Sequence, residues 1–372
     1  MAGDRPAKVV SAQPDNPRMP VNTLPAATVA QMLDRFDTVI DARTPAEHAL
    51  DHIPGAENWP SLDNEQRIVI GTMYKQVNAF EAKKRGAAMV FHNIASHVDR
   101  AVIDKPKGWR PLVYCWRGGN RSGALAWALG AIGFQVTLVE GGYKAWRAEL
   151  VLDIARRVSP LRFKVVCGPT GCGKTRLLHA LAAQGAQVLD LEALAKHRGS
   201  VLGHLPGTPQ PTQKHFDTLI WSAFQRFDPA RPVFVESESK KVGNLRVPEA
   251  LIDAMRASPC IDLQLPDDER VALLLEDYAY LINDPAYFCE RLGALTELRG
   301  KSVVAAWADQ VQRGQFADVF RDLLRQHYDP GYAASIQRNF TQYGEAEAFA
   351  LPDRSPASFA TLATHLLGAT PA

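Results

Sequence analysis

The feature that most restricts the fold of this chain is a glycine-rich turn between a predicted strand and a predicted helix. The apolar run Phe163-Lys164-Val165-Val166-Cys167 leads into Gly168-Pro169-Thr170-Gly171-Cys172-Gly173-Lys174-Thr175, and an apolar helical segment follows. In this context the spacing G-x-x-x-x-G-K-T predicts a P-loop, a turn whose backbone amides wrap a di- or triphosphate. We expect phosphate contacts from Gly168, Gly171, Gly173, Lys174 and Thr175, with Thr175 also available to Mg²⁺. The alternative is a loop of this shape that no longer binds a ligand.

Two more strands are predicted after this loop, and each ends in carboxylates. One spans residues 187–192 and carries Asp190, and the other spans residues 232–238 and carries Glu236. Either carboxylate suits the Walker-B role of orienting a metal-bound water, although ordinary strand-end carboxylates fit the pattern equally well. The more continuously apolar second strand favours Glu236. Together these elements predict a P-loop NTPase-like α/β domain over residues 161–266.

The strand pattern gives way to helical spacing after Pro266. Helices are expected over Asp267–Ile282, Tyr287–Leu298, Val303–Gln312 and Phe316–His327. The segment Tyr328-Asp329-Pro330 is predicted to end that run with a turn, and residues 352–372 to hold one short helix and a tail. Residues 267–372 are therefore predicted to form a mostly helical region that packs with the P-loop domain.

A second glycine-containing loop, in the first half of the chain, surrounds a cysteine. The strand Val113-Tyr114 ends at Cys115, and Trp116-Arg117-Gly118-Gly119-Asn120-Arg121-Ser122 leads into an alanine-rich helix. This order aims backbone amides and a helix N-terminus at the sulfur, which lowers a thiol pKa and binds anions. Arg117 and Arg121 add positive charge, so we expect a nucleophilic thiolate in an anion-binding cradle. The alternative is a buried cysteine that serves only as a small apolar side chain.

The segments around Cys115 alternate between helical and strand patterns. A helix is expected over Thr28–Phe36, with buried strands at Val39-Ile40 and Val136–Leu138. This alternation implies a parallel sheet covered by helices. We expect residues 1–20 to be a mobile tail, residues 21–150 the sheet domain and residues 151–160 a helical connector. The predicted fold class is α/β, with two sheet domains and a mostly helical C-terminal region.

Three segments of the first domain resemble the rhodanese superfamily. These are the cysteine loop, then Asp41-Ala42-Arg43 with Glu47–Ala56 for the D-x-R and E-x-x-x-G-H-I-P-G-A signature, and Val139–Trp146 for the closing segment. The match implies a rhodanese-like fold for residues 21–150. Asp51 replaces a glycine of the signature, and five residues lie between the cysteine and the last arginine of the loop where single-sulfur rhodaneses usually have four. The longer loop suits a bulkier tetrahedral anion, as in dual-specificity phosphatases, but Tyr114 stands where those phosphatases carry histidine and argues against phosphatase chemistry.

Composition narrows the class of protein. Five cysteines without paired spacing argue against a disulfide framework and favour a reducing cytoplasm. No run of eighteen apolar residues occurs, so no membrane association is expected. The formal charge of +2 does not indicate a nucleic-acid partner by itself, so such a partner would need local basic patches.

Local basic patches do occur. Residues 60–106 exceed what a minimal rhodanese needs, and they hold Lys75 and the triplet Lys83-Lys84-Arg85. A solvated helical insertion explains this charge pattern, and an RNA-facing surface also explains it, since lysine and aromatic residues supply charge and stacking. The other candidate pairs are Arg156 with Arg157 and Lys240 with Lys241.

A rhodanese-like domain followed by a P-loop domain resembles the tRNA 2-selenouridine synthase family. The resemblance covers nearly the whole chain and includes Gly71–Gln76, His197–Ser200, Glu236–Ser239 and His327–Tyr332. It implies a cytoplasmic transferase that acts on 2-thiouridine at the wobble position of tRNAs for Lys, Glu and Gln. The thiocarbonyl sulfur would first be geranylated from geranyl diphosphate. Selenium from selenophosphate would then replace the geranylated sulfur to give 2-selenouridine.

Within that scheme the two loops acquire roles. We expect the P-loop to hold diphosphate rather than to serve ATP hydrolysis, because departure of diphosphate from an allylic carbon needs an anion sink. Arg117 and Arg121 would bind selenophosphate, and Cys115 would either carry selenium as a perselenide or only position it. Geranyl diphosphate and selenophosphate are the implied co-substrates, Mg²⁺ is compatible with the P-loop, and no tightly bound cofactor is expected. A selenophosphate-supplying enzyme is an implied partner.

Three other functions remain open on the sequence. A simple rhodanese sulfurtransferase would use Cys115 but would leave the P-loop unexplained. A nucleotide-regulated RNA-binding module would not need Cys115. A small-molecule kinase would use the P-loop, but the segments after the loop contain no recognisable phosphoacceptor site.

Overall fold

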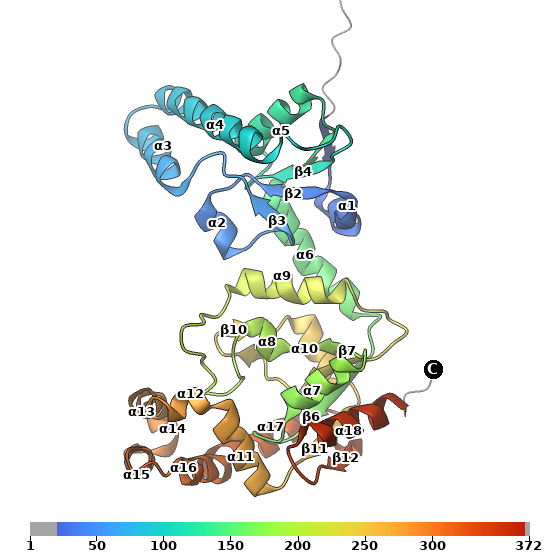
Figure 1. Ribbon diagram of the computed structural model, residues 1–372, viewed down its shortest axis with the longest axis vertical. Helices are drawn as coiled ribbons and strands as arrows, with labels where there is room; N and C mark the ends of the chain where they lie inside the picture. The colour runs from blue at the N-terminus through green and yellow to red at the C-terminus, as the bar shows by residue number, and fades with distance from the viewer. Residues whose placement is uncertain (1–20, 369–372) are drawn as a thin grey trace, which may run out of the picture. The chain divides into compact units, whose positions relative to one another are not determined.

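The computed structural model describes residues 21–368 of the chain (Figure 1). The predicted mobile tail, residues 1–20, and the last four residues of the predicted C-terminal tail lie outside the described residues. The described chain forms two compact units that divide between Arg147 and Ala148, and Leu50–Pro54 group with the second unit. Within residues 21–368, no helix combines the length and the apolar character needed to span a membrane.

A five-stranded parallel sheet forms the centre of the first unit, with strand order β1-β5-β4-β2-β3. Its strands are β1 Val21–Leu24, β2 Thr38–Asp41, β3 Ala56–Asn58, β4 Pro111–Tyr114 and β5 Val136–Val139. Every residue of β2 and β4 is buried, because helices cover both faces of the sheet (Figure 1). The parallel, helix-covered sheet predicted for this part of the chain is therefore confirmed.

The helical segments of the first unit match the sequence pattern with two differences. They are α1 Ala26–Gln31, a 3₁₀ turn Leu33–Arg35, α2 Pro45–Leu50, α3 Asn64–Gln76, α4 Ala79–Ala101, α5 Asn120–Ile132 and α6 Gly142–Val158. Met32 leaves helical geometry with a φ of −133° and splits the helix predicted over Thr28–Phe36. α6 runs unbroken across the boundary between the units, so the connector predicted at residues 151–160 is the end of a helix that begins at Gly142.

The second unit is built on another five-stranded parallel sheet, with strand order β12-β11-β6-β8-β7. The strands are β6 Phe163–Cys167, β7 Gln187–Leu189, β8 Val233–Glu236, β11 Cys260–Gln264 and β12 Glu347–Ala350, and β9 Lys241–Val242 and β10 Leu245–Arg246 form a small antiparallel hairpin. β12 lies in the region predicted to be helical. It is a mostly exposed edge strand whose register is set by pairing with the distant β11, so its own residues carry little strand pattern.

Helices surround this second sheet and make up most of the C-terminal region. They are α7 Lys174–Ala183, α8 Leu191–Ala195, α9 Gln213–Phe224, α10 Glu249–Arg256, α11 Asp267–Asp277, α12 Ala279–Ile282, α13 Pro285–Gly293, α14 Thr296–Arg299, α15 Lys301–Gln312, α16 Phe316–Leu323, α17 Asp329–Asn339 and α18 Pro356–Gly368, with a 3₁₀ turn at Tyr343–Glu345. The turn predicted at Tyr328-Asp329-Pro330 is wrong, because a π-helical segment, Leu324–Tyr328, leads directly into α17. Pro330 lies in the first turn of α17, where proline is tolerated.

The C-terminal helices pack on the elements that carry the P-loop. Leu177 and Leu181 of α7 share an apolar cluster with Phe359 and Leu366 of α18, and Figure 1 shows α18 beside α7. Burial of a single side chain such as Phe359 contributes about 1.5–3 kcal/mol to folding. A second cluster joins α11 to α13, α15 and α16. The helical region is therefore part of the same unit as the P-loop.

A phosphate-loop cavity and a cysteine loop as candidate functional sites

Glycines shape the P-loop between β6 and α7. Gly168, Gly171 and Gly173 have φ values of 140°, 79° and 90°, which side-chain-bearing residues rarely adopt. A Cβ atom at Gly168 would overlap the carbonyl oxygen of Leu263, and one at Gly173 would overlap the ring of Phe359. The backbone conformation and the close packing of distant segments therefore both require glycine in this loop.

Lys174 and Thr175 begin α7 directly after these glycines. Lys174 Nζ donates to the Gly168 carbonyl at 2.8 Å and lies 5.7 Å from the centre of the Tyr332 ring. The Tyr332 hydroxyl accepts a hydrogen bond from the Gly168 amide at 2.5 Å. Thr175 Oγ1 lies 3.5 Å from Oε2 of Glu192. The ammonium group is thus held over the loop that the sequence assigns to phosphate.

A buried arginine on α11 braces the P-loop. The Arg270 guanidinium donates to the Thr170 carbonyl at 2.8 and 3.0 Å and to the carboxylate of Asp329 at 2.5 and 3.1 Å. Burial by itself lowers the pKa of Arg270, but the hydrogen bonds and the charge of Asp329 outweigh it, so the pKa is raised. The P-loop backbone is therefore tied to α17 through the buried guanidinium of Arg270 and the partly exposed carboxylate of Asp329.

Arg270→Met is expected to lower the free energy of unfolding by about 2–4 kcal/mol, because it leaves the Thr170 carbonyl and the Asp329 carboxylate without their partner. Urea unfolding followed by circular dichroism measures the change. Arg321→Met is the matched control, since Arg321 pairs with Asp318 at 2.9 Å near the surface. The control should change stability by less than about 0.5 kcal/mol, and equal effects of the two substitutions would contradict the bracing role.

Three glutamates gather beside the P-loop. Glu192 lies in the first turn of α8, Glu236 ends β8, and Glu238 follows two residues later. Glu236 Oε1 accepts a hydrogen bond from the Glu192 amide at 3.0 Å. A Cβ at Gly199 would come within 2.5 Å of Glu192 and 2.8 Å of Glu238, so this glycine allows the backbone to approach both carboxylates. Burial and the neighbouring carboxylates raise the pKa of all three, that of Glu238 to about 8.

The two carboxylates predicted for the Walker-B role are not the ones that line the cavity at the P-loop. Asp190 instead caps α8 and lies 3.1 Å from Nε2 of His179, and Glu236 is buried behind the cavity wall. Glu192 and Glu238, each two residues further along, line the cavity. A usable signal was present, because a second acidic residue follows each predicted one: Glu192 after Asp190 and Glu238 after Glu236. Among residues 21–368, no group of three or more His, Cys, Asp or Glu side chains is arranged to hold a metal ion.

Glu238→Gln is expected to stabilise the protein at alkaline pH. The folded state retains the Glu238 proton up to about pH 8, whereas the unfolded chain releases it near the ordinary pKa of 4.5. Retention of this proton therefore stabilises the folded state fully below the unfolded-state pKa, and that contribution is lost as the pH rises through the folded-state pKa. At about pH 8.5 the glutamine should raise the free energy of unfolding by roughly 2–4 kcal/mol, with little change at about pH 4. Urea titrations at both pH values test this prediction, and Glu249→Gln at an exposed position is the control. An equal increase in the free energy of unfolding of Glu238→Gln at the two pH values would contradict the prediction.

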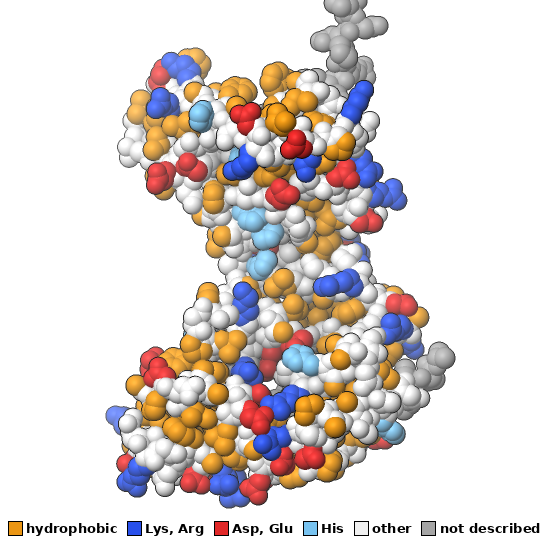
Figure 2. All heavy atoms as spheres, viewed as in Figure 1, with side chains coloured by type: hydrophobic (Ala, Val, Ile, Leu, Met, Phe, Trp, Pro, Cys, Tyr) orange, Lys and Arg blue, Asp and Glu red, His pale blue; other side chains and the backbone are white. Residues whose placement is uncertain are grey.

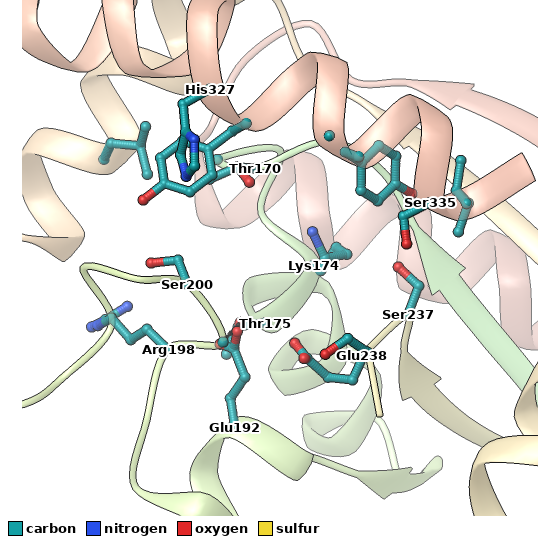
Figure 3. A pocket seen from close by; sticks show the side chains of 18 of the residues that line it. Thr170, Lys174, Thr175, Glu192, Arg198, Ser200, Ser237, Glu238, His327 and Ser335 are labelled. Carbon is teal, nitrogen blue, oxygen red and sulfur yellow. Dashed lines mark hydrogen bonds between the residues drawn. The ribbon is translucent and has the colours of Figure 1, made fainter. Parts of the chain in front are cut away.

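The P-loop, Glu192 and Glu238 line a cavity of about 540 Å³. Figure 3 shows Arg198 and Ser200 at one end, Lys174, Thr175 and Glu238 near the middle, and Ser237 and Ser335 at the other end. The rest of the lining includes the apolar side chains of Leu273, Leu274, Leu298, Ile336 and Phe340. The volume falls within the ~300–1,000 Å³ of small-molecule sites, and the lining suits a ligand with an anionic and an apolar part.

Cys115 lies at the end of β4, next to the N-terminus of α5. Its sulfur accepts hydrogen bonds from the Ser122 hydroxyl at 3.1 Å and from the Gly119 amide at 3.3 Å. Burial by itself raises the pKa of Cys115, but the Ser122 hydroxyl and the amides of Ser122, Gly119 and Arg117 outweigh it, so the pKa is lowered. The amide nest predicted from the glycine turn is present, and Ser122, predicted as a residue of the anion-binding loop, contributes its hydroxyl as a further donor.

The two arginines of the cysteine loop contribute less to the sulfur than the sequence suggested. Arg121 donates to the Glu47 carboxylate at 2.7 and 3.4 Å, and both side chains are partly buried. Arg117 is exposed, and Cys115 is only 3% exposed at the base of the loop. The groups that lower the thiol pKa are therefore amides and a hydroxyl, and the charge of Arg121 is shared with a carboxylate.

Other residues of the rhodanese-like signature support the loop. Asp41 and Arg43 form a fully buried pair at 2.6 Å, and the Arg43 guanidinium lies 3.9 Å from the centre of the Tyr143 ring. Tyr143 in turn stacks with Trp116 of the cysteine loop, their centroids 5.6 Å apart. A Cβ at Gly142 would overlap the Cys115 carbonyl, so the closing segment packs directly on the loop. These residues hold the cysteine loop in position and add no charge next to the Cys115 sulfur.

The predicted RNA contacts fall on three surfaces. Lys75 near the end of α3, Lys83, Lys84 and Arg85 in the first turns of α4, and Lys240 and Lys241 at β9 are all exposed. On α6, Arg156 and Arg157 are both within ion-pair distance of Asp153, and Arg156 also contacts Glu149. The α6 pair is therefore less available to phosphates than the sequence alone suggested.

Comparison with known proteins identifies both units. Residues 25–149 match the rhodanese-like domain model, and residues 161–299 match the model of the tRNA 2-selenouridine synthase AAA domain. A tRNA 2-selenouridine synthase of Nitrosomonas europaea is 32% identical over 327 residues, which cover 87% of this chain and 79% of that protein. One from Alcanivorax borkumensis is 34% identical over 309 residues, covering 81% of this chain and 82% of that protein. The chain belongs to the tRNA 2-selenouridine synthase family.

Membership of the tRNA 2-selenouridine synthase family confirms the resemblance drawn from the two loops and the fold class that followed from it. The AAA-domain match of this family extends to residue 299, past the boundary predicted at residue 266. The extension takes in α11, whose Arg270 braces the P-loop. The helices after residue 266 thus begin within the family's P-loop domain and not after it.

Proposed function

We propose that this family member converts 2-thiouridine at the wobble position of tRNA into 2-selenouridine in two steps. The thiocarbonyl sulfur first attacks the allylic carbon of geranyl diphosphate, the carbon–oxygen bond breaks, and diphosphate leaves. Selenium derived from selenophosphate then adds at C2, and geranylthiol departs. Alkylation makes the exchange feasible, because a geranylthiolate leaves more readily than sulfide.

The observation that supports the first step is the mixed character of the P-loop cavity. The loop amides and Lys174 suit the diphosphate and the charge that develops on it as the carbon–oxygen bond breaks. The apolar lining, which includes Leu274 and Phe340, suits a hydrocarbon chain. Thr175 and Glu192 offer oxygen ligands for Mg²⁺, a cation that usually combines one or two protein ligands with substrate phosphates.

The second step is assigned to Cys115. Selenium in selenophosphate is fully reduced, so cleavage of the phosphorus–selenium bond without an oxidant releases hydrogen selenide. In the balanced scheme the Cys115 thiolate attacks phosphorus, a sulfur–phosphorus bond forms, hydrogen selenide leaves to attack C2, and water later hydrolyses the phosphocysteine. The perselenide expected from the sequence would need a two-electron oxidant here. The amides around the sulfur can stabilise phosphoryl oxygens as they stabilise the thiolate.

Mass spectrometry of the wobble nucleoside tests this function. The purified protein is incubated with tRNA for Lys, Glu or Gln that carries 2-thiouridine. Geranyl diphosphate alone should give the S-geranyl nucleoside, further addition of selenophosphate should give 2-selenouridine, and ATP in place of geranyl diphosphate should give neither product. Formation of 2-selenouridine without geranyl diphosphate, or fast thiosulfate–cyanide turnover with no change in tRNA, would contradict the proposal and favour a simple sulfurtransferase.

A further inference from the structure

The α3–α4 hairpin of the first unit projects from the core that holds the sheet. No residue of α3 is buried, and Ile70 of α3 packs against α4 at Gly86, where a Cβ would meet it at 3.5 Å. Only the second half of α4 joins the main core, through Ile94 and the partly buried Val90, Val98 and Ala101. His97 and Asn93 anchor that half by bonding the carbonyls of Pro60 and Ser61. The tip of the hairpin therefore contributes little to the folding of the unit.

The hairpin nevertheless carries large apolar side chains on its surface, from the tip to the middle of α4. Tyr74, Val77, Phe80 and Phe91 are 57%, 65%, 68% and 54% exposed. Phe80 and Phe91 are eleven residues apart on α4, a spacing that returns to the same face of a helix after three turns. Exposed aromatic rings on one face of a helix with no burial role indicate a surface that another molecule covers.

Basic side chains alternate with these rings. Residues 74–85 contain Lys75, Lys83, Lys84 and Arg85 against the single acidic residue Glu81. Lys84 pairs with Glu81 at 2.6 Å and lies 5.1 Å from the centre of the Phe80 ring. Lys75, Lys83 and Arg85 have no ion-pair partner within the described part of the chain. Figure 2 shows Lys and Arg side chains next to hydrophobic ones in the part of the first unit where Figure 1 places α3 and α4.

We propose that the exposed face of the α3–α4 hairpin, from its tip at Phe80 to Phe91 in the middle of α4, holds the single-stranded anticodon loop of the tRNA. Phe80 and Phe91 would stack on unpaired bases, and Lys83 and Arg85 would contact phosphates. Aromatic rings interleaved with cations are the side chains that bind unpaired RNA, because every base offers a face for stacking and every nucleotide a charge. A second copy of the chain fits this surface less well, because two tips of the same charge would repel each other. The identity of the RNA rests on the proposed function, whereas the binding surface itself is inferred from the exposed rings and cations of the hairpin.

Fluorescence anisotropy with a labelled anticodon stem–loop and the full-length protein tests this surface. Phe80→Ala with Phe91→Ala should weaken binding by about tenfold or more and leave its salt dependence unchanged. Lys83→Gln with Arg85→Gln should weaken binding and lower the slope of log affinity against log salt by about 1.4, as expected for two lost contacts to single-stranded phosphates. Trp127→Ala and Lys107→Gln, an exposed ring and an exposed cation outside the hairpin, are the matched controls and should change affinity less than about twofold.

Unchanged affinity in both hairpin variants would overturn this inference. A second result would also overturn it: the wild-type protein is a dimer, and Phe80→Ala with Phe91→Ala makes it monomeric without weakening RNA binding. The surface would then bind a second copy of the chain. Circular dichroism of each variant checks that the fold is retained, as expected for exposed positions. Geranyl transfer to the free 2-thiouridine nucleoside separates the two proposals: it should survive the hairpin substitutions, and its absence in the wild-type protein would count against the proposed function alone.

Discussion

Cys115→Ala is expected to reduce 2-selenouridine formation by at least about 10³-fold while geranyl transfer to tRNA continues near the wild-type rate. The Cys115 sulfur, which accepts hydrogen bonds from the Ser122 hydroxyl and the Gly119 amide, is the only group in the proposed scheme that cleaves the phosphorus–selenium bond. Quantifying the S-geranyl and 2-selenouridine nucleosides by mass spectrometry measures both steps in one reaction. The S-geranyl nucleoside should accumulate in the variant.

Two further variants serve as controls for this experiment. Cys289→Ala removes a half-exposed thiol from the second unit and should leave both steps unchanged. Ser122→Ala keeps the sulfur but removes a hydrogen bond that lowers its pKa, so the pH dependence of selenation should shift to higher pH. If folded Cys115→Ala protein that still binds tRNA loses geranylation as well, the division of the two steps between the two loops is wrong.

Lys174→Ala is expected to lower the rate of geranyl transfer by about 10²–10³-fold or more, because it removes the cation over the loop that receives the departing diphosphate. Conversion of tRNA that already carries the S-geranyl group should proceed at the wild-type rate, since the cysteine loop is intact. Product analysis with unmodified and with pre-geranylated tRNA measures both rates.

Lys164→Ala is the control for this substitution. Lys164 precedes the same loop on β6, but its amine lies over the Phe234 ring, 5.8 Å from the centre, and does not line the P-loop cavity. Geranyl transfer at the wild-type rate in Lys174→Ala would show that the P-loop does not hold the diphosphate. Failure of pre-geranylated tRNA to react in that variant would show that the P-loop also serves the second step.

The loops themselves were predictable because their chemistry is local. A strand, a glycine turn and a helix within about fifteen residues define both the P-loop and the nest around Cys115, so short-range spacing is enough to place Lys174 and the sulfur. The side-chain pairings that join each loop to the rest of its unit involve residues distant in the sequence, and these could not be predicted from local spacing. The pairing of Arg121 with Glu47 spans 74 residues, and that of Arg270 with Asp329 spans 59.

The missed features have the same physical origin. β12 is a strand because β11 offers it a free edge, and its own four residues carry no strand signal. Pro330 was taken to end a helix, but proline is compatible with a first turn, and only the packing of α17 shows that a new helix starts there. Glu192 and Glu238 line the cavity in place of Asp190 and Glu236 because Asp190 is used to cap α8 and Glu236 is still part of the buried strand β8.

The most direct test of this account is a single-turnover time course with wild-type protein, 2-thiouridine tRNA, geranyl diphosphate and selenophosphate, analysed by mass spectrometry of the wobble nucleoside. We predict that the S-geranyl nucleoside rises first and then declines as 2-selenouridine appears, and that the tryptic peptide containing Cys115 carries a phosphoryl group during the decline. Appearance of 2-selenouridine with no lag, in step with loss of 2-thiouridine and without an S-geranyl intermediate, would contradict it.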